Sequence, residues 1–221
     1  MFMKKFCLVI LFTCILVFAV FPQTGIIREL AGDVQIKARG AADFSPAQIG
    51  STVALDTIVS TGFRSNALIE ISSTLITVRP LTRLSLAEIR SSSGTESLNV
   101  NLQAGRIRVD VAPPAGTRAD IVIQAPVATA SVRGTSFEMD TRNLNVVSGS
   151  VNWSDSNGFS MAVSSGYSST ISETDKAVDP VEIAKLELTP STPVGSGEAG
   201  ESLRSSAFDT ESGDVNIGFG W

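Results

Sequence analysis

Between residues 26 and 171 the chain repeats one pattern, which strongly limits the folds open to it. Segments of four to six residues alternate apolar and polar side chains, and a turn containing glycine, proline or serine separates each from the next. Leu98–Leu102 and Arg106–Val111 show the alternation most clearly. We also predict one strand over Val53–Thr61, a loop at Ser91–Gly94 and a hairpin-like or rung-like turn at Ser148-Gly149. Alternation with a period of two is typical of a strand that is buried on one face. Some ten to twelve such segments predict an all-β domain.

Glycines recur just before the predicted strands, at Gly32, Gly105, Gly134, Gly149 and Gly166. Glycine adopts the backbone conformations that sharp bends require. Because the spacing between these glycines is not constant, we expect an irregular β-roll or a solenoid-like coil of short strands rather than a strict repeat. A β-sandwich is the alternative.

The stretch from Val127 to Asp140 predicts a strand, a tight turn and a second strand. Gly134 provides the bend, and Phe137 and Met139 fall on one face of the second strand. No catalytic group is evident in this stretch, so we expect it to form one corner of the coil. Arg133 lies at the turn. Its guanidinium either hydrogen-bonds to turn carbonyls and a carboxylate or contacts a partner, and we favour the first, structural role.

The amino-terminal 25 residues have the pattern of a secretory signal. Lys4 and Lys5 precede an almost wholly apolar run, Phe6 to Phe21, and a polar break follows. An uncleaved anchor is one alternative, and a lipoprotein acylated at Cys14 is another that fits poorly because the apolar run continues past that residue. Every version exports residues 26 onward, which predicts a periplasmic or cell-envelope location.

Histidine is absent from the chain, and the two cysteines, Cys7 and Cys14, lie in the apolar run. Catalytic systems built on histidine and histidine-ligated metals are therefore excluded. We expect no cofactor and no metal. A net charge of -5 without a basic stripe argues against nucleic-acid binding.

Beyond residue 171 the composition changes, and residues 172–221 carry ten acidic and three basic side chains. Asp179 and Pro180 form a helix-start signal, which predicts a short helix over residues 180–188. Residues 189–206 have the composition of a disordered segment. Residues 214–221, which include Trp221, form either a disordered end, which we favour, or a terminal strand or docking motif. The predicted domains are thus a leader (1–25), a β domain (26–171) and an acidic tail (172–221).

Charged residues within the β domain admit two interpretations. Asp33, Asp56, Asp110 and Asp140 include candidates for a hydrolytic carboxylate pair, but acids at turns and on solvent faces are common, and we expect Asp56 to organise a turn. Two predicted strands carry further charges on their polar faces. If these strands are neighbours, they form a cross-strand charge ladder, and a ligand patch is the alternative. The ladder residues are Arg106, Arg108, Asp110, Glu138 and Asp140, with Arg142 just beyond.

Three aromatic residues, Trp153, Phe159 and Tyr167, fall near the end of the β domain. We expect them to cap the core rather than to stack on sugar.

Several motifs in this order resemble the FecR-type domain over roughly residues 30–170. They are Gly32-Asp33-Val34, Asp56–Thr61, Ser65–Ile69, Leu102–Ile107, Ala125-Pro126-Val127-Ala128, Val132-Arg133-Gly134-Thr135-Ser136-Phe137 and Ser148–Val151. The chain departs from the family pattern at Leu55, where the family usually has glycine, and at Ser72-Ser73-Thr74, where it usually has Asp-Gly-Ser.

The resemblance implies a solenoid-like, exported sensing or binding module without catalysis. The residues that carry its fold motif here are Gly32, Asp56, Gly105, Pro126, Val132, Arg133, Gly134, Thr135, Phe137 and Gly149; it names no ligand-binding residue. The best-known members place a cytoplasmic anti-sigma segment before the membrane. Here the apolar run lies at the start of the chain, so we do not expect the sigma-regulator role.

The partner implied by the resemblance is a protein or an envelope component, and the resemblance includes a role in signalling among those it implies. Membrane contact is expected only through an uncleaved amino-terminal segment. A structural or adhesive surface protein that docks through its tail is the alternative function, and a carboxylate-based hydrolase is a weaker one.

Overall fold

The structure is a computed structural model that describes residues 23–92 and 94–188. The described residues form seventeen strands and one helix, α2 (Pro180–Leu188). The all-β fold class and the short helix are therefore confirmed.

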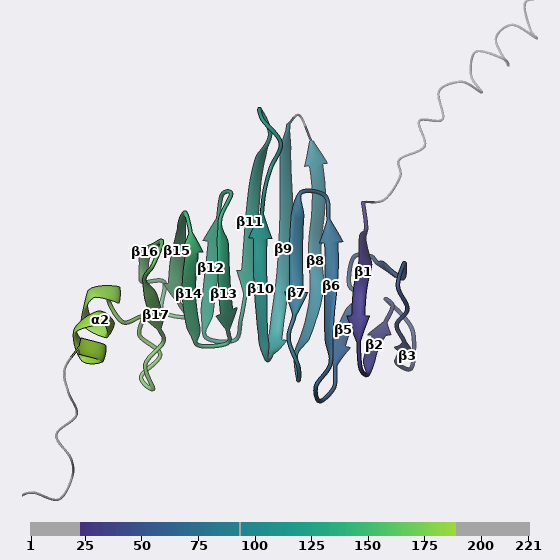
Figure 1. Cartoon of the computed structure of the whole chain (residues 1–221), viewed down its shortest axis with the longest axis horizontal. Helices are drawn as coiled ribbons and strands as arrows, with labels where there is room; N and C mark the ends of the chain where they lie inside the picture. The colour runs from purple at the N-terminus through teal and green to yellow at the C-terminus, as the bar shows by residue number, and fades with distance from the viewer. Residues whose placement is uncertain (1–22, 93, 189–221) are drawn as a thin grey trace, which may run out of the picture. The chain divides into compact units, whose positions relative to one another are not determined.

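Eight strands form the first sheet, called sheet A, which faces the viewer in Figure 1. In spatial order they are β17 (Ser168–Thr170), β14 (Asn143–Ser148), β13 (Ser136–Asp140), β10 (Arg106–Val111), β7 (Thr74–Val78), β6 (Asn66–Ile71), β1 (Gly25–Ala31) and β4 (Thr52–Val53).

Nine strands form the second sheet, called sheet B, behind the first. In spatial order they are β16 (Ser160–Ser164), β15 (Ser150–Asp155), β12 (Ala128–Val132), β11 (Arg118–Gln124), β9 (Thr95–Ala104), β8 (Arg83–Ser92), β5 (Ile58–Thr61), β2 (Val34–Lys37) and β3 (Ser45–Pro46). The β9–β11 pair is parallel, and the other strand pairs of the described ranges are antiparallel.

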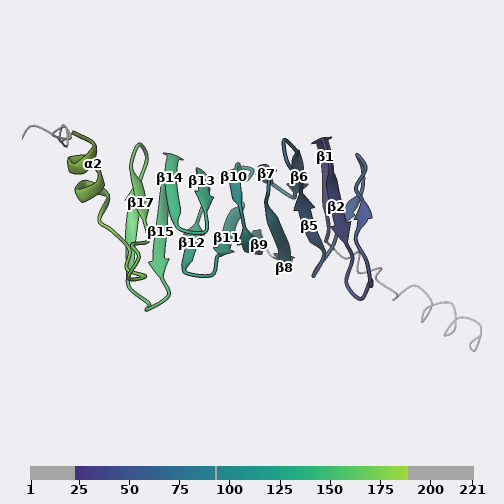
Figure 2. The same ribbon diagram turned by 90° about the horizontal axis from the view of Figure 1, so that it is seen from below.

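The chain advances along both sheets together as it alternates between them. From β6 onward it runs two strands in sheet A, two in B, one in A, two in B, two in A and two in B, then returns to A at β17. This steady advance is the irregular coil that the sequence predicts (Figures 1 and 2). The two facing layers are what a sandwich also shows, but the strand order identifies a coil.

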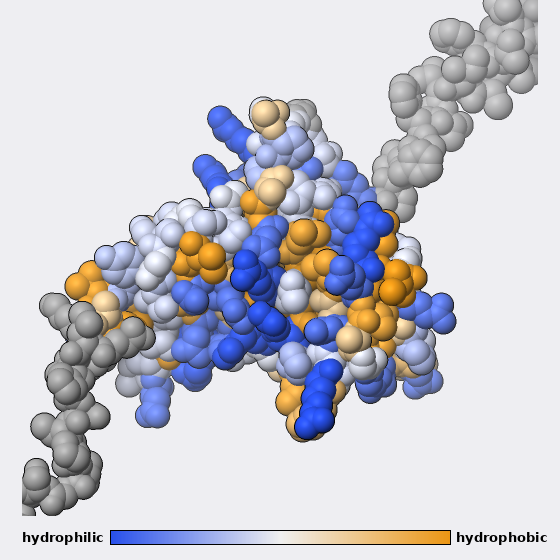
Figure 3. Space-filling view, viewed as in Figure 1, coloured by the Kyte–Doolittle hydropathy of each residue, from blue (hydrophilic) through white to orange (hydrophobic). Residues whose placement is uncertain are grey.

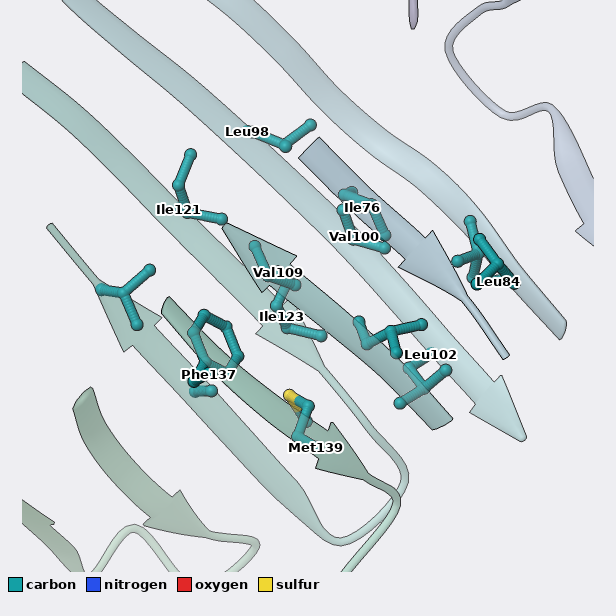
Figure 4. Packing of buried hydrophobic residues seen from close by; sticks show 14 of the residues in the cluster. Ile76, Leu84, Leu98, Val100, Leu102, Val109, Ile121, Ile123, Phe137 and Met139 are labelled. Atoms are coloured by element: carbon teal, nitrogen blue, oxygen red, sulfur yellow. The ribbon is translucent and has the colours of Figure 1, made fainter. Parts of the chain in front are cut away.

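The core lies between the sheets and is built by the alternation within each strand. Leu98, Val100 and Leu102 of β9 point toward sheet A, where they meet residues such as Ile76 and Val109 (Figure 4). All five are at most 4% exposed. A fully buried aliphatic side chain contributes roughly 1.5–3 kcal/mol, so this layer supplies most of the favourable free energy of folding.

Several local predictions are wrong. The segment Val53–Thr61, predicted as one strand, is divided by a turn at Leu55 and Asp56 into β4 and β5. The predicted loop Ser91–Gly94 is shorter, because β8 continues through Ser92. β8 and β9 each have ten residues, longer than the predicted four to six. They are long because Leu98 and Ile89 extend the apolar alternation toward the end of the hairpin.

The Ser148-Gly149 turn, predicted as hairpin-like or rung-like, is rung-like because it joins β14 of sheet A to β15 of sheet B. β1 begins at Gly25, the last residue of the predicted leader. The domain boundaries themselves remain predictions. The acidic segment 189–221 and most of the leader lie outside the described residues.

Candidate functional site

The predicted charge ladder forms on the outer face of sheet A. β10 and β13 are antiparallel neighbours, with Arg106 opposite Asp140 and Arg108 opposite Glu138. The two charged strands are therefore neighbours, which is what the predicted charge ladder requires. Strongly hydrophilic side chains gather over β10 and β13 in Figure 3, while apolar patches lie over β6 and β1.

The ion pairs within the ladder do not all follow the strand register. Arg108 turns along its own strand and donates from Nε and Nη2 to Asp110, at 3.0 and 3.2 Å. This two-pronged contact lowers the pKa of Asp110 and raises that of Arg108. Glu138 faces Arg79 at the end of β7 instead, with Nε and Oε1 3.6 Å apart.

Asp140 organises the turn between β13 and β14. Its Oδ1 accepts hydrogen bonds from the backbone amides of Arg142 and Asn143, both at 2.8 Å, and the Asn143 side-chain amide adds two more. Burial by itself would raise the pKa of Asp140, but these donors together lower it. The Arg106 guanidinium reaches the same carboxylate only at 3.4 Å. Asp140 is thus satisfied by its own turn and binds Arg106 weakly.

A shallow surface hollow lies beside this turn, and we call it the arginine hollow. Arg79, Arg106 and Arg142 line it together with the carboxylates of Glu138 and Asp140. The third guanidinium, that of Arg142, is paired with Asp175 just outside the lining, so the charges around the hollow balance. Exposed Leu81, which has a φ of 56°, adds an apolar wall to the hollow.

The three arginines of the hollow differ in how fully they are engaged. Arg142 donates to the Ser172 carbonyl at 3.0 Å and to Asp175 at 3.3 Å, so it is held in place. Arg79 faces Glu138 only at 3.6 Å through its buried Nε, while its side chain is 42% exposed and makes no hydrogen bond among the described residues. Arg106 is 58% exposed and makes a single long contact. Arg79 and Arg106 therefore keep donors for a group from outside.

The Val132–Thr135 segment passes from β12 in sheet B to β13 in sheet A, so it is a corner of the coil. Val132 and Thr135 are buried, and Gly134 has a φ of 73°. Arg133 points outward, 81% exposed, and its Nε donates to Asp120 at 2.9 Å. Phe137 is fully buried in the core.

The other three motif glycines pack closely against a serine or threonine of a neighbouring corner. A Cβ at Gly105 would lie 2.4 Å from the Cα of Thr82, and the corresponding closest approaches are 2.4 Å at Gly32 and 2.3 Å at Gly149. The partners of Gly32 and Gly149 are Ser65 and Thr135. These glycines let successive corners pack closely, and each partner is at most 2% exposed.

Asp56 and Pro126 lie at turns away from the hollow. Asp56 has a φ of 59° in the turn closed by the Thr57 amide and the Ala54 carbonyl, and its own amide donates to Leu86 at 2.7 Å. Pro126 is exposed in the short turn between β11 and β12. The structure thus distributes the motif residues over several corners and does not gather them into one pocket.

Two of the candidate hydrolytic carboxylates, Asp110 and Asp140, lie too far apart for a glycosidase pair. Asp110 lies opposite Ser136 and Asp140 lies opposite Arg106, so four residues of strand separate them, roughly 13 Å at 3.3 Å per residue. Glycosidase pairs are about 5–9.5 Å apart, and their acid has a raised pKa. Both carboxyls here have a lowered pKa.

The aromatic residues near the end of the coil fall into two groups. Trp153 is fully buried in the core, as predicted. Phe159 and Tyr167 are 57% and 45% exposed, so the prediction that they cap the core is wrong. Both lie next to edge strands, Phe159 beside residues 174–177 and Tyr167 beside the start of α2.

No cluster of three or more acidic or cysteine ligands suited to a metal ion occurs within residues 23–92 and 94–188. Over the same ranges, no helix is both long and apolar enough to cross a membrane.

One known protein family matches part of this chain. Residues 57–152 match the family described as FecR protein, which confirms the resemblance over that segment. Such domains are signalling-related regulatory modules. No curated protein matches the chain.

Two solved structures are similar at low identity, and both are of a "putative anti-sigma factor" from Parabacteroides distasonis. Their sequence identities are 14% and 13%, and their TM-scores are 0.46 and 0.45. Each alignment covers 59% of this chain, and 63% and 64% of those chains, so the match spans less than two thirds of their length.

Proposed function

We propose that this chain is an exported, non-catalytic interaction module of FecR type that acts in envelope signalling by binding an acidic segment of a partner protein at the arginine hollow. The observation that carries the proposal is the pair Arg79 and Arg106, whose partly exposed side chains contact carboxylates only at 3.6 and 3.4 Å. Export rests on the amino-terminal basic and apolar pattern.

The hollow suits a carboxylate better than other groups. A guanidinium presents several N–H donors in a planar fork that matches a carboxylate. Glu138 and Asp140 also line the hollow, and Asp175 pairs with Arg142, so the charges around the hollow balance, which disfavours highly charged polyanions. Exposed Leu81 provides the kind of apolar contact that protein interfaces add to charged ones.

Capture from the envelope fraction of the source organism tests the proposal. The wild-type chain should retain a protein with an acidic segment, identified by mass spectrometry, and the Arg79→Ala/Arg106→Ala double variant should lose at least nine tenths of it. Arg28→Ala is the matched control, because Arg28 is also exposed on sheet A but pairs with Glu70 outside the hollow. Equal capture by the double variant, or none by the wild type, would contradict the proposal.

A further inference from the structure

The outer face of sheet B carries a straight row of short, uncharged polar side chains. Six consecutive strands, β8, β9, β11, β12, β15 and β16, each contribute one residue, and the register places each residue opposite the next. In order they are Ser85, Asn101, Gln124, Thr129, Ser154 and Ser160. At about 4.8 Å between strands, the row extends for roughly 24 Å.

The polar side chains of this row are not hydrogen-bonded to other residues of the described structure. None of the six side chains takes part in a hydrogen bond within the described part of the chain. In the adjacent row, the Oδ1 atom of Asn99 is buried and lacks a partner. Each side chain both donates and accepts, so the face offers a ladder of mixed hydrogen-bonding groups.

The charge and shape of the face favour one class of ligand. The row has no charged residue, which disfavours nucleic acid and acidic protein segments. It has no aromatic, methionine or arginine anchor, which are the residues that dominate protein interfaces. A neutral polymer rich in hydroxyl groups needs neither charge nor anchors, because it binds through many dispersed hydrogen bonds.

We propose that the outer face of sheet B binds a neutral polysaccharide strand that lies along the row, across the strands of the sheet. The adjacent row widens the contact surface with Ser131, Asn152 and Ala162, which are opposite one another in β12, β15 and β16. Charges of the adjacent row and its flank compensate each other: Arg133 pairs with Asp120, and Arg90 pairs with Glu88. Arg83, two residues before Ser85 at one end of the row, instead lies over the Phe44 ring. This site is separate from the arginine hollow on sheet A.

Co-sedimentation of the full chain with insoluble chitin and microcrystalline cellulose, and its retardation in gels containing amylose, test this proposal. We expect binding to at least one of the three, weakened at least tenfold by Asn152→Arg. Asn145→Arg is the matched control, because Asn145 is also exposed but lies in β14 on the outer face of sheet A. That control should bind like the wild type.

Three results would overturn the proposal: no binding to any of the three polysaccharides, equal binding by Asn152→Arg, or a concentration-dependent dimer in light scattering that Asn152→Arg abolishes. The last would show that a second copy of the chain covers the face. If Asn152→Arg does not melt cooperatively, Gln124→Ala replaces it, with a smaller expected weakening of about threefold.

Discussion

The two outer faces of the coil are built on the same core yet present opposite chemistries. On sheet A, charged side chains pair with one another, as in the contact between Arg108 and Asp110. On sheet B, the row from Ser85 to Ser160 is uncharged and makes no side-chain hydrogen bond within the described residues. Because strand alternation fixes only the inner residues, the outer positions are free to differ. One scaffold can therefore present two distinct surfaces.

Both faces depend on the corners that hold the two sheets in register, so breaking a corner should have the largest effect. Gly105→Ala places a Cβ against the backbone of Thr82 at a φ of 88°. We expect a loss of roughly 3–5 kcal/mol in unfolding free energy from overpacking together with a left-handed backbone. Urea denaturation measures it.

Gly134→Ala is the matched control for this change. The residue also has a positive φ, but its nearest neighbour, Pro113, would be 3.8 Å from the new Cβ. The expected loss is only about 1–2 kcal/mol. If Gly134→Ala were the more damaging of the two, close stacking of the corners would not be what the glycines provide.

Two buried threonines at the corners, Thr82 and Thr135, provide a second comparison, with a smaller expected change in the free energy of unfolding. The Thr82 hydroxyl accepts from the Arg106 amide and donates to its carbonyl, both at 3.0 Å, and so links a corner to the charged face. Thr82→Val should cost about 1–3 kcal/mol, because it leaves the partly buried Arg106 amide without a partner, while the Arg106 carbonyl still accepts from the Arg79 amide.

The hydroxyl of Thr135 is buried without a partner, so Thr135→Val should leave stability unchanged or raise it. Thermal melting of both variants distinguishes the two corners. A similar loss in both would mean that the Thr135 hydroxyl has a role beyond the hydrogen bonds of the described residues.

Acid should weaken the charged face selectively. The folded state lowers the pKa of Asp140 and Asp110, so the unfolded chain binds more protons as the pH falls below their ordinary value of about 3.9. The stability these carboxylates provide is full above that pH and is lost as the pH falls toward their folded pKa.

We therefore expect Asp140→Asn to have a shallower decline of melting temperature than the wild type between roughly pH 5 and pH 2.5. Asn152→Arg on sheet B should follow the wild-type decline. Parallel curves for Asp140→Asn and the wild type would show that the carboxylate does not contribute to acid sensitivity.

Much of the fold can be predicted from the sequence because alternation determines burial directly. Phe137 and Met139 are buried as their spacing predicts, and Asp179 and Pro180 mark the start of α2. The turns were harder to predict where non-glycine residues take a positive φ. Asp56 does so in a turn, as predicted for it, whereas Ser72 and Leu81 also take a positive φ, and a leucine gives no local signal for that conformation.

The candidate site was only partly predictable. The charges of β10 and β13 are evident in the sequence, but their juxtaposition needs the strand pairing. Arg79 was missed because it directly follows a third strand, β7, which is distant in sequence, and its approach to Glu138 follows from the coil. The neutral row was missed because each strand contributes only one residue to it, so no local pattern reveals it.

Site-specific photocrosslinking from the two faces in the source organism most directly tests whether they serve different partners. A photoreactive residue at Leu81, beside the arginine hollow, should crosslink to a protein, and the adduct should disappear in the Arg79→Ala/Arg106→Ala variant. The same residue at Ala162, on the outer face of sheet B, should give no protein adduct. A protein adduct at Ala162, or its absence at Leu81, would contradict the account.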